Sequence, residues 1–198
     1  MSNKVKAKDV LLLLLYLPGK NDENNEPIVG KTRITKMMFL FEQELLKNFN
    51  NVSQDSLPSF FAYNYGPFSK DLLDDIRFFE TIGFIGEEII DSNPHEAEVA
   101  EYMMDINEEL VDEEANIENI GYVGEPQFYL TKTGKEFVEN ELLKPNKFTE
   151  IQIDILKKFK KRINTLTLNQ LLTYVYTKYD EFTEKSVIRE KILGKQEG

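Results

Sequence analysis

Apolar residues recur at helical spacing between residues 31 and 48, and this predicted helix organises the chain. Its inward stripe consists of Ile34, Met37, Met38, Phe41 and Leu45. Intervals of three and four residues place these side chains on one face of a helix. Thr32, Arg33 and Lys36 are expected on the other side, near the start of the helix.

A second helix is predicted at residues 70–82, after a short aromatic segment at 59–65. Gly66-Pro67 interrupts the aromatic segment and predicts a turn. Ser69 is a favourable N-cap, and Gly83 stands where a helix ends. The core face of this helix is predicted to carry Leu72, Leu73, Ile76, Phe79 and Ile82.

Two later segments alternate apolar and polar residues as β-strands do. Residues 84–90 follow the second helix directly, and residues 127–130 are their expected partner. Two helices joined through a turn and followed by a strand pair have the element order of a winged helix. The predicted fold class is therefore mainly α with a small antiparallel β-wing.

The first helix, predicted at residues 6–17, is apolar nearly all round, which indicates a helix at the centre of a core. Lys4, Lys6 and Lys8 come before or at its start, as basic residues precede the apolar part of a signal peptide. The Pro18-Gly19 sequence that follows offers no small-residue cleavage site, and the apolar run is too short to span a bilayer. We expect a buried first helix in a cytoplasmic protein that does not associate with a membrane.

Four more helices are predicted after the strands, the first of them capped by Thr131. Their expected ranges are 131–143, 149–163, 168–179 and 183–193. The predicted organisation is a winged-helix-like domain at residues 1–143 followed by a helical C-terminal extension at 144–198.

The charge of the chain is concentrated in one segment. The 198 residues include 24 Lys and Arg and 35 Asp and Glu, for a formal net charge of −11. Residues 86–125 hold 14 of these acids and no Lys or Arg, so the rest of the chain has 24 bases against 21 acids, a net charge of +3. A mildly basic body therefore carries an acidic insertion at 86–125.

Apolar residues recur at roughly helical spacing inside the acidic insertion, which predicts an amphipathic helix at about 96–110. Its outward acids would engage a basic protein partner. The candidate partner-binding residues are Glu96, Glu101, Asp105, Glu108, Glu109 and Asp112. There are two alternatives: the acids fold back on the basic cluster at 157–162 and compete with DNA for it, or the segment is a solvated excursion without a partner.

Basic residues outside the insertion are candidate contacts for DNA, because Lys and Arg supply sequence-independent affinity for phosphates. The candidate nucleic-acid-binding residues are Lys31, Arg33, Lys36, Lys157, Lys158, Lys160, Lys161 and Arg162. The helix at 70–82 would contact bases in a winged helix, but acids dominate its outer face and would repel the DNA backbone. DNA binding and protein binding therefore both stay open.

No catalytic, cofactor or metal site is expected. Gly30-Lys31-Thr32 resembles the end of a phosphate-binding P-loop, but Asn25 stands where that loop requires a glycine. His95 is the single histidine and the chain has no cysteine, so the usual ligands of a zinc site are too few. We predict a non-enzymatic regulatory protein without a cofactor.

Three motifs resemble the YwgA-like family and the related Panacea-type antitoxin domains. Members pair an R-L-x-K-L-x-F helix, a Y-G-P-F/Y-S turn and a Y-x-L-T-x-x-G junction, and the similar segments here lie at 32–40, 65–69 and 129–134. The resemblance covers about residues 8–143 and implies a winged-helix-like fold with a regulatory or toxin-neutralising role. It implies no catalytic residues, and the acidic insertion at 86–125 departs from the compact wing of the family.

Overall fold

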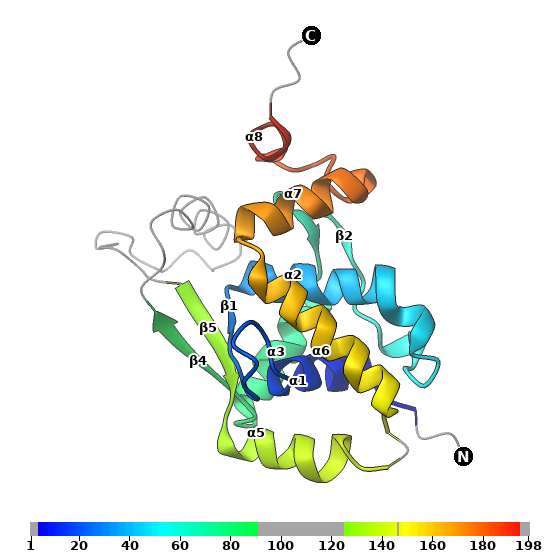
Figure 1. Ribbon diagram of the computed structural model, residues 1–198. Coiled ribbons are helices and arrows are strands. Elements are labelled where there is room, and N and C mark those ends of the chain that lie inside the picture. The colour runs from blue at the N-terminus through cyan, green and yellow to red at the C-terminus, as the bar shows by residue number, and fades with distance from the viewer. Residues whose placement is uncertain (1–3, 91–124, 146, 195–198) are drawn as a thin grey trace.

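The computed structural model describes residues 4–90, 125–145 and 147–194. Most of these residues are helical, and a three-stranded antiparallel sheet lies at one side of the helices (Figure 1). The predicted class, mainly α with a small antiparallel sheet, is confirmed. The predicted helix at 96–110 and the six acidic candidates between residues 96 and 112 lie outside the described residues.

The helices follow the predicted order along the chain. They are α1 (Ala7–Tyr16), α2 (Lys31–Leu40), α3 (Lys70–Thr81), α5 (Lys132–Phe137), α6 (Glu150–Thr165), α7 (Leu168–Lys178) and α8 (Arg189–Leu193). Single π-helical turns, η1 (Phe41–Leu45) and η4 (Val138–Leu142), extend α2 and α5. Short 3-10 turns lie at Leu46–Asn48, Gln54–Ser56 and Asp180–Phe182.

Four helices begin at a side-chain cap. Ser69, Thr131, Thr149 and Thr167 each accept a hydrogen bond from the backbone N–H three residues later. Such a cap satisfies one of the N–H groups that a helix start leaves without a partner. The predicted caps at Ser69 and Thr131 are confirmed, and Gly83 ends α3 with a φ of 73° that favours glycine.

The sheet has the strand order β1-β5-β4 and is antiparallel throughout. Its strands are β1 (Ile28–Val29), β4 (Ile85–Ile90) and β5 (Glu125–Leu130). The predicted pairing of residues 84–90 with 127–130 is confirmed, and the register places Ile85 opposite Leu130. Strand β1 is not among the elements predicted from the sequence.

A separate hairpin joins β2 (Phe61–Tyr63) to β3 (Gly66–Phe68), so the turn predicted at Gly66-Pro67 is displaced. The two-residue turn lies at 64–65, and Gly66-Pro67 belongs to the second strand. Gly66 has a φ of 80°, and an added Cβ would lie 2.9 Å from the ring of Tyr176. Both features require glycine there.

One hydrophobic core contains α1 and the two long C-terminal helices. Every residue from Val10 to Leu15 is buried, which confirms α1 as the central helix (Figure 1). Leu156 on α6 and Leu171 on α7 belong to the same cluster of buried side chains. The segment predicted as an appended extension therefore supplies part of the core that surrounds α1.

The helix predicted at 183–193 is much shorter than expected, because only Arg189–Leu193 is helical. The Thr183 hydroxyl donates to the Asp180 carbonyl at 2.9 Å, and the Ser186 hydroxyl donates to the Asn64 carbonyl at 3.0 Å. These side chains compete with the hydrogen bonds of a helix and tie the segment to the β2–β3 hairpin.

Candidate functional site

The outer surface of α3 combines acidic and apolar side chains. Phe78 and Ile82 lie four residues apart and are 46% and 42% exposed, although both are large and apolar. The ionisable residues of the helix are Lys70, Asp71, Asp74, Asp75, Arg77 and Glu80, so it carries a net charge of −2. We call the set Asp71, Asp74, Asp75, Phe78 and Ile82 the α3 face; Glu80 lies on the other flank of α3, beside Glu87 of β4 (Ile85–Ile90).

The carboxylates of the α3 face repel one another. Partial burial raises the pKa of Asp75; Lys8 opposes the rise, and the charges of Asp71 and Asp74 add to it. Burial also raises the pKa of Glu80, and the neighbouring carboxyl of Glu87 on β4 raises it further. A positively charged group placed between these carboxylates would offset their repulsion.

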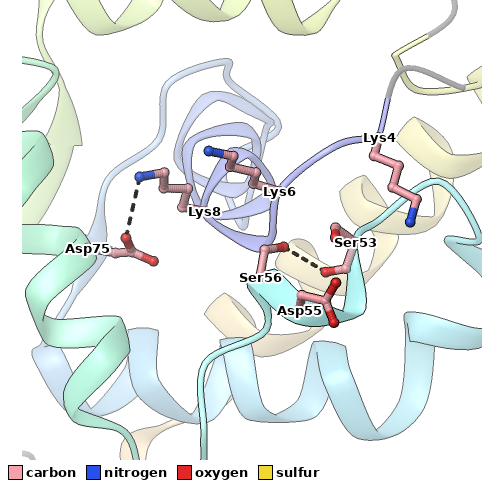
Figure 2. Close-up of a pocket in the computed structure, with 7 residues that line it drawn as sticks. All are labelled: Lys4, Lys6, Lys8, Ser53, Asp55, Ser56 and Asp75. Atoms are coloured by element: carbon pink, nitrogen blue, oxygen red, sulfur yellow. Dashed lines mark hydrogen bonds and ion pairs between the residues drawn. The ribbon is translucent and has the colours of Figure 1, made fainter. Parts of the chain in front are cut away.

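A pocket of about 440 Å³ adjoins the α3 face (Figure 2). It is lined by Lys4, Lys6, Lys8, Ser53, Asp55, Ser56 and Asp75. Lys8 points at Asp75 with 3.7 Å between ammonium and carboxylate, and the same ammonium lies 4.5 Å from the centre of the Phe78 ring. Lys8 therefore connects the pocket to the α3 face and partly neutralises it.

Arg33 and Lys36 are buried on α2, although the sequence placed them on its polar side. The Arg33 guanidinium donates to the carbonyls of Ile163 and Leu166 at 2.9 and 2.7 Å, and thereby caps the end of α6. The Lys36 ammonium donates to the Pro67 carbonyl at 2.8 Å. Neither side chain can contact a phosphate in this position, and we remove both from the candidate nucleic-acid interface.

Lys160 is buried as well and leaves the candidate interface for the same reason. Its ammonium donates to the carbonyls of Leu15, Leu17 and Glu26 at 3.3, 2.6 and 2.6 Å. Burial lowers the pKa of Lys160 to about 7, against the opposing charge of Glu26. Burial alone lowers the pKa of Lys36 to about 7. Both lysines hold the core together through backbone carbonyls.

The other candidate basic residues are exposed but mostly engaged. Lys31, beside β4, lies 3.8 Å from Glu87, whereas the remaining four residues lie on α6. The ion pairs on α6 are Lys158 with Asp154 at 2.7 Å, Lys161 with Asp22 at 2.7 Å and Arg162 with Glu44 at 2.9 Å. Lys157 forms no ion pair within the described part of the chain. The structure thus separates Lys31 from the α6 lysines and leaves Lys157, Lys158 and Lys161 as the exposed basic stretch.

Glu44, in the π-helical turn η1, accepts hydrogen bonds from four side chains, which the sequence did not indicate. Its carboxylate accepts hydrogen bonds from Arg162, Tyr174, Lys178 and Tyr179 at 2.5 to 3.2 Å. Burial opposes the ionised form, but the bonds from Arg162, Tyr174 and Lys178 lower the pKa of Glu44 to about 2. The cluster fastens η1 to α6 and α7. Its partners lie more than 100 residues from Glu44, so no local sequence pattern marks them.

Neither a membrane-spanning helix nor a metal-ligand cluster is present among the described residues. None of their helices is long and apolar enough to cross a membrane. Across residues 4–90, 125–145 and 147–194, no group of three or more His, Cys, Asp or Glu side chains is placed to hold a metal ion.

Two of the motifs that resemble the YwgA-like family are in contact, because the Lys36–Pro67 hydrogen bond joins the first to the second. The third motif is tied to the end of α3 instead, where the Thr131 hydroxyl donates to the Gly83 carbonyl at 2.5 Å. The resemblance itself stays a prediction. No protein-family model matches the chain, and no curated protein matches it either.

Proposed function

We propose that the protein is a non-enzymatic interaction module that binds a basic protein partner through the α3 face. The single observation that carries this proposal is the composition of that face, where exposed Phe78 and Ile82 lie on the same side of the helix as the carboxylates of Asp71, Asp74 and Asp75. Apolar side chains supply the buried centre of an interface, and charges around them select the partner. A basic partner would also relieve the repulsion between Asp75 and its acidic neighbours.

The element order supports a winged-helix arrangement as the scaffold of this module. Helices α1, α2 and α3 precede the β4–β5 pair, and β1 completes a sheet in the order β1-β5-β4. In that arrangement α3 takes the place of the helix that reads DNA bases. A helix with a net charge of −2 is poorly suited to the DNA backbone, which favours a protein at this position.

Neutralising two acids of the α3 face is expected to weaken binding of a basic probe about tenfold. The variant is Asp71→Asn with Asp74→Asn, both exposed, and the probe is a fluorescent 15-residue amphipathic peptide of Lys and Leu. Two exposed charge pairs are worth about 1–2 kcal/mol together. Fluorescence anisotropy at low and physiological salt measures the dissociation constants.

The matched control changes the same net charge elsewhere, at exposed Glu181 and Glu184, each replaced by Gln. Binding should remain within about twofold of the unsubstituted protein. Equal weakening in both variants would show that the peptide responds only to net charge, and the α3 face would then lose its role.

Duplex DNA is the second candidate ligand, favoured by the winged-helix element order and by Lys157, Lys158 and Lys161 along α6. Binding of a mixed-sequence duplex should weaken steeply with salt, and Lys157→Gln with Lys161→Gln should reduce the logarithmic salt slope by about one for each lost phosphate contact. Lys47→Gln with Lys132→Gln is the control, because both side chains are exposed outside α6. An unchanged slope in the α6 variant would exclude this surface.

A further inference from the structure

Strand β4 has an edge that no described strand covers. In the order β1-β5-β4 it pairs only with β5, and Figure 1 shows it at the outer side of the sheet. The strand is six residues long, and Glu87, Glu88 and Ile89 are exposed. An uncovered edge of this length presents backbone donors and acceptors to which another strand can add.

The register identifies which backbone groups point outward. The Thr131 N–H donates to the Phe84 carbonyl at 3.0 Å, so every second residue from Phe84 bonds toward β5. Pro126, opposite Ile89, lacks an N–H, and its carbonyl accepts from Gly30 on the β1 side at 2.7 Å. Both observations identify the same residues of β4, namely Phe84 and every second residue after it, as the ones that bond to β5. The outward groups of β4 are therefore those of Ile85, Glu87 and Ile89.

The charge along this edge selects its occupant. Glu87 and Glu88 are exposed on the strand, and Glu80 of α3 adjoins Glu87. Within the described residues, Lys31 forms an ion pair with Glu87 at 3.8 Å. A second copy pairing through β4 would bring these carboxylates against their equivalents, which destabilises a sheet. Residues 91–124 contain 11 acids and no Lys or Arg, so pairing of this segment with β4 would also place acids against Glu87 and Glu88.

We propose that β4 receives an extended basic segment of the partner as an additional strand. This inference rests on the proposed function, because it names the way in which the basic partner is held. Backbone hydrogen bonds from Glu87 and Ile89 would supply affinity. Because Glu87 and Glu88 point to opposite faces of the sheet, Lys or Arg at alternate positions of the added strand would lie on the face of Glu88, and the residues between them on the face of Glu87 and Ile89. The exposed Ile89 side chain, 58% accessible, would pack against the apolar residues between those bases.

The test uses two ten-residue peptides of alternating Lys and Val, one of them N-methylated at alternate residues. Methylation removes the peptide's own N–H donors and keeps its charge, so it blocks strand addition specifically. The unmodified peptide should bind at least tenfold more tightly. In the full-length protein, NMR-detected hydrogen exchange should slow at the Glu87 and Ile89 amides when this peptide is added.

Two protein variants complete the test. Ile89→Pro removes an N–H that points away from β5. Residue 89 lies opposite Pro126 and makes no hydrogen bond to β5, so the substitution leaves the β4–β5 ladder intact. It should therefore abolish binding of the unmodified peptide. Ile89→Ser keeps the N–H and should retain most of the binding. Thermal unfolding followed by circular dichroism confirms that both variants are folded.

The outcomes separate this inference from the proposed function. Equal binding of the two peptides, both weakened by Asp71→Asn with Asp74→Asn, would overturn strand addition and leave the α3 face as the binding surface. If neither peptide binds, both proposals are overturned. Loss of binding in Ile89→Pro with unchanged exchange at Glu87 would also overturn strand addition.

Discussion

Replacing Gly134 by alanine is expected to destabilise the protein by about 3 kcal/mol, at the upper end of what overpacking usually costs. An added Cβ would lie 2.1 Å from the Phe84 carbonyl oxygen, which is a backbone atom. That oxygen is held in place, because it accepts from the Thr131 N–H at 3.0 Å while the Phe84 N–H donates to Phe79 at 2.8 Å. Neither side of the contact can move without breaking the strand-to-helix junction.

Urea unfolding at fixed temperature measures this cost, with Thr133→Ala as the control on the exposed side of the same helix turn. The control should change the free energy of unfolding by no more than about half a kcal/mol. A similarly small change for Gly134→Ala would contradict the close approach of α5 to Phe84.

The free energy of unfolding is expected to rise as the pH increases from 7 to about 10. Lys36 and Lys160 have pKa values of about 7 in the folded protein, whereas an unfolded lysine titrates near 10.4. Between these values the unfolded chain binds more protons than the folded one, so each lysine adds up to about 1.4 kcal/mol per pH unit. Below pH 7 both states are protonated at these lysines, and this gain is absent.

The rise should end near pH 10. Burial raises the pKa of Tyr176 and Tyr179 to about 12, so the unfolded chain loses these protons first and stability falls above pH 10. Chemical unfolding at half-unit steps from pH 6 to 11 gives the profile. Lys36→Met and Lys160→Met should each flatten the rising part, and exposed Lys47→Met should leave it unchanged. A flat profile in the unsubstituted protein would contradict the burial of both ammonium groups.

Local sequence patterns predicted the helices well where an element has two different faces. The caps at Ser69 and Thr131 are short-range features, and the structure contains both. The predicted core face of α3 is confirmed at its buried residues Leu72, Ile76 and Phe79, whereas Leu73 is half-buried and Ile82, which follows the last residue of the helix, is 42% exposed. The same method misplaced Arg33 and Lys36, because α2 is buried all round from residue 33 to 40. The periodicity argument assumes that one face of a helix is exposed to solvent, so it places polar residues on that face even when the whole helix is buried.

Features that depend on distant partners could not be predicted from the sequence. The two residues of β1 become a strand only because β5, about 100 positions later, pairs with them. The four donors around Glu44 likewise come from α6 and α7. The acids on the outer side of α3 were visible in the sequence, but the exposure of Phe78 and Ile82 and the approach of Glu80 to Glu87 on β4 required the structure.

The burial of α1 has a consequence for how the chain is made. Its leucines are synthesised before α6, which crosses α1 and holds the Leu15 and Leu17 carbonyls through Lys160 but follows α1 by more than 130 residues (Figure 1). On the ribosome the side of α1 that α6 covers stays exposed until residues 150–165 have emerged. We therefore expect the nascent chain to bind chaperones that recognise apolar segments, and a chain that stops before residue 150 to aggregate.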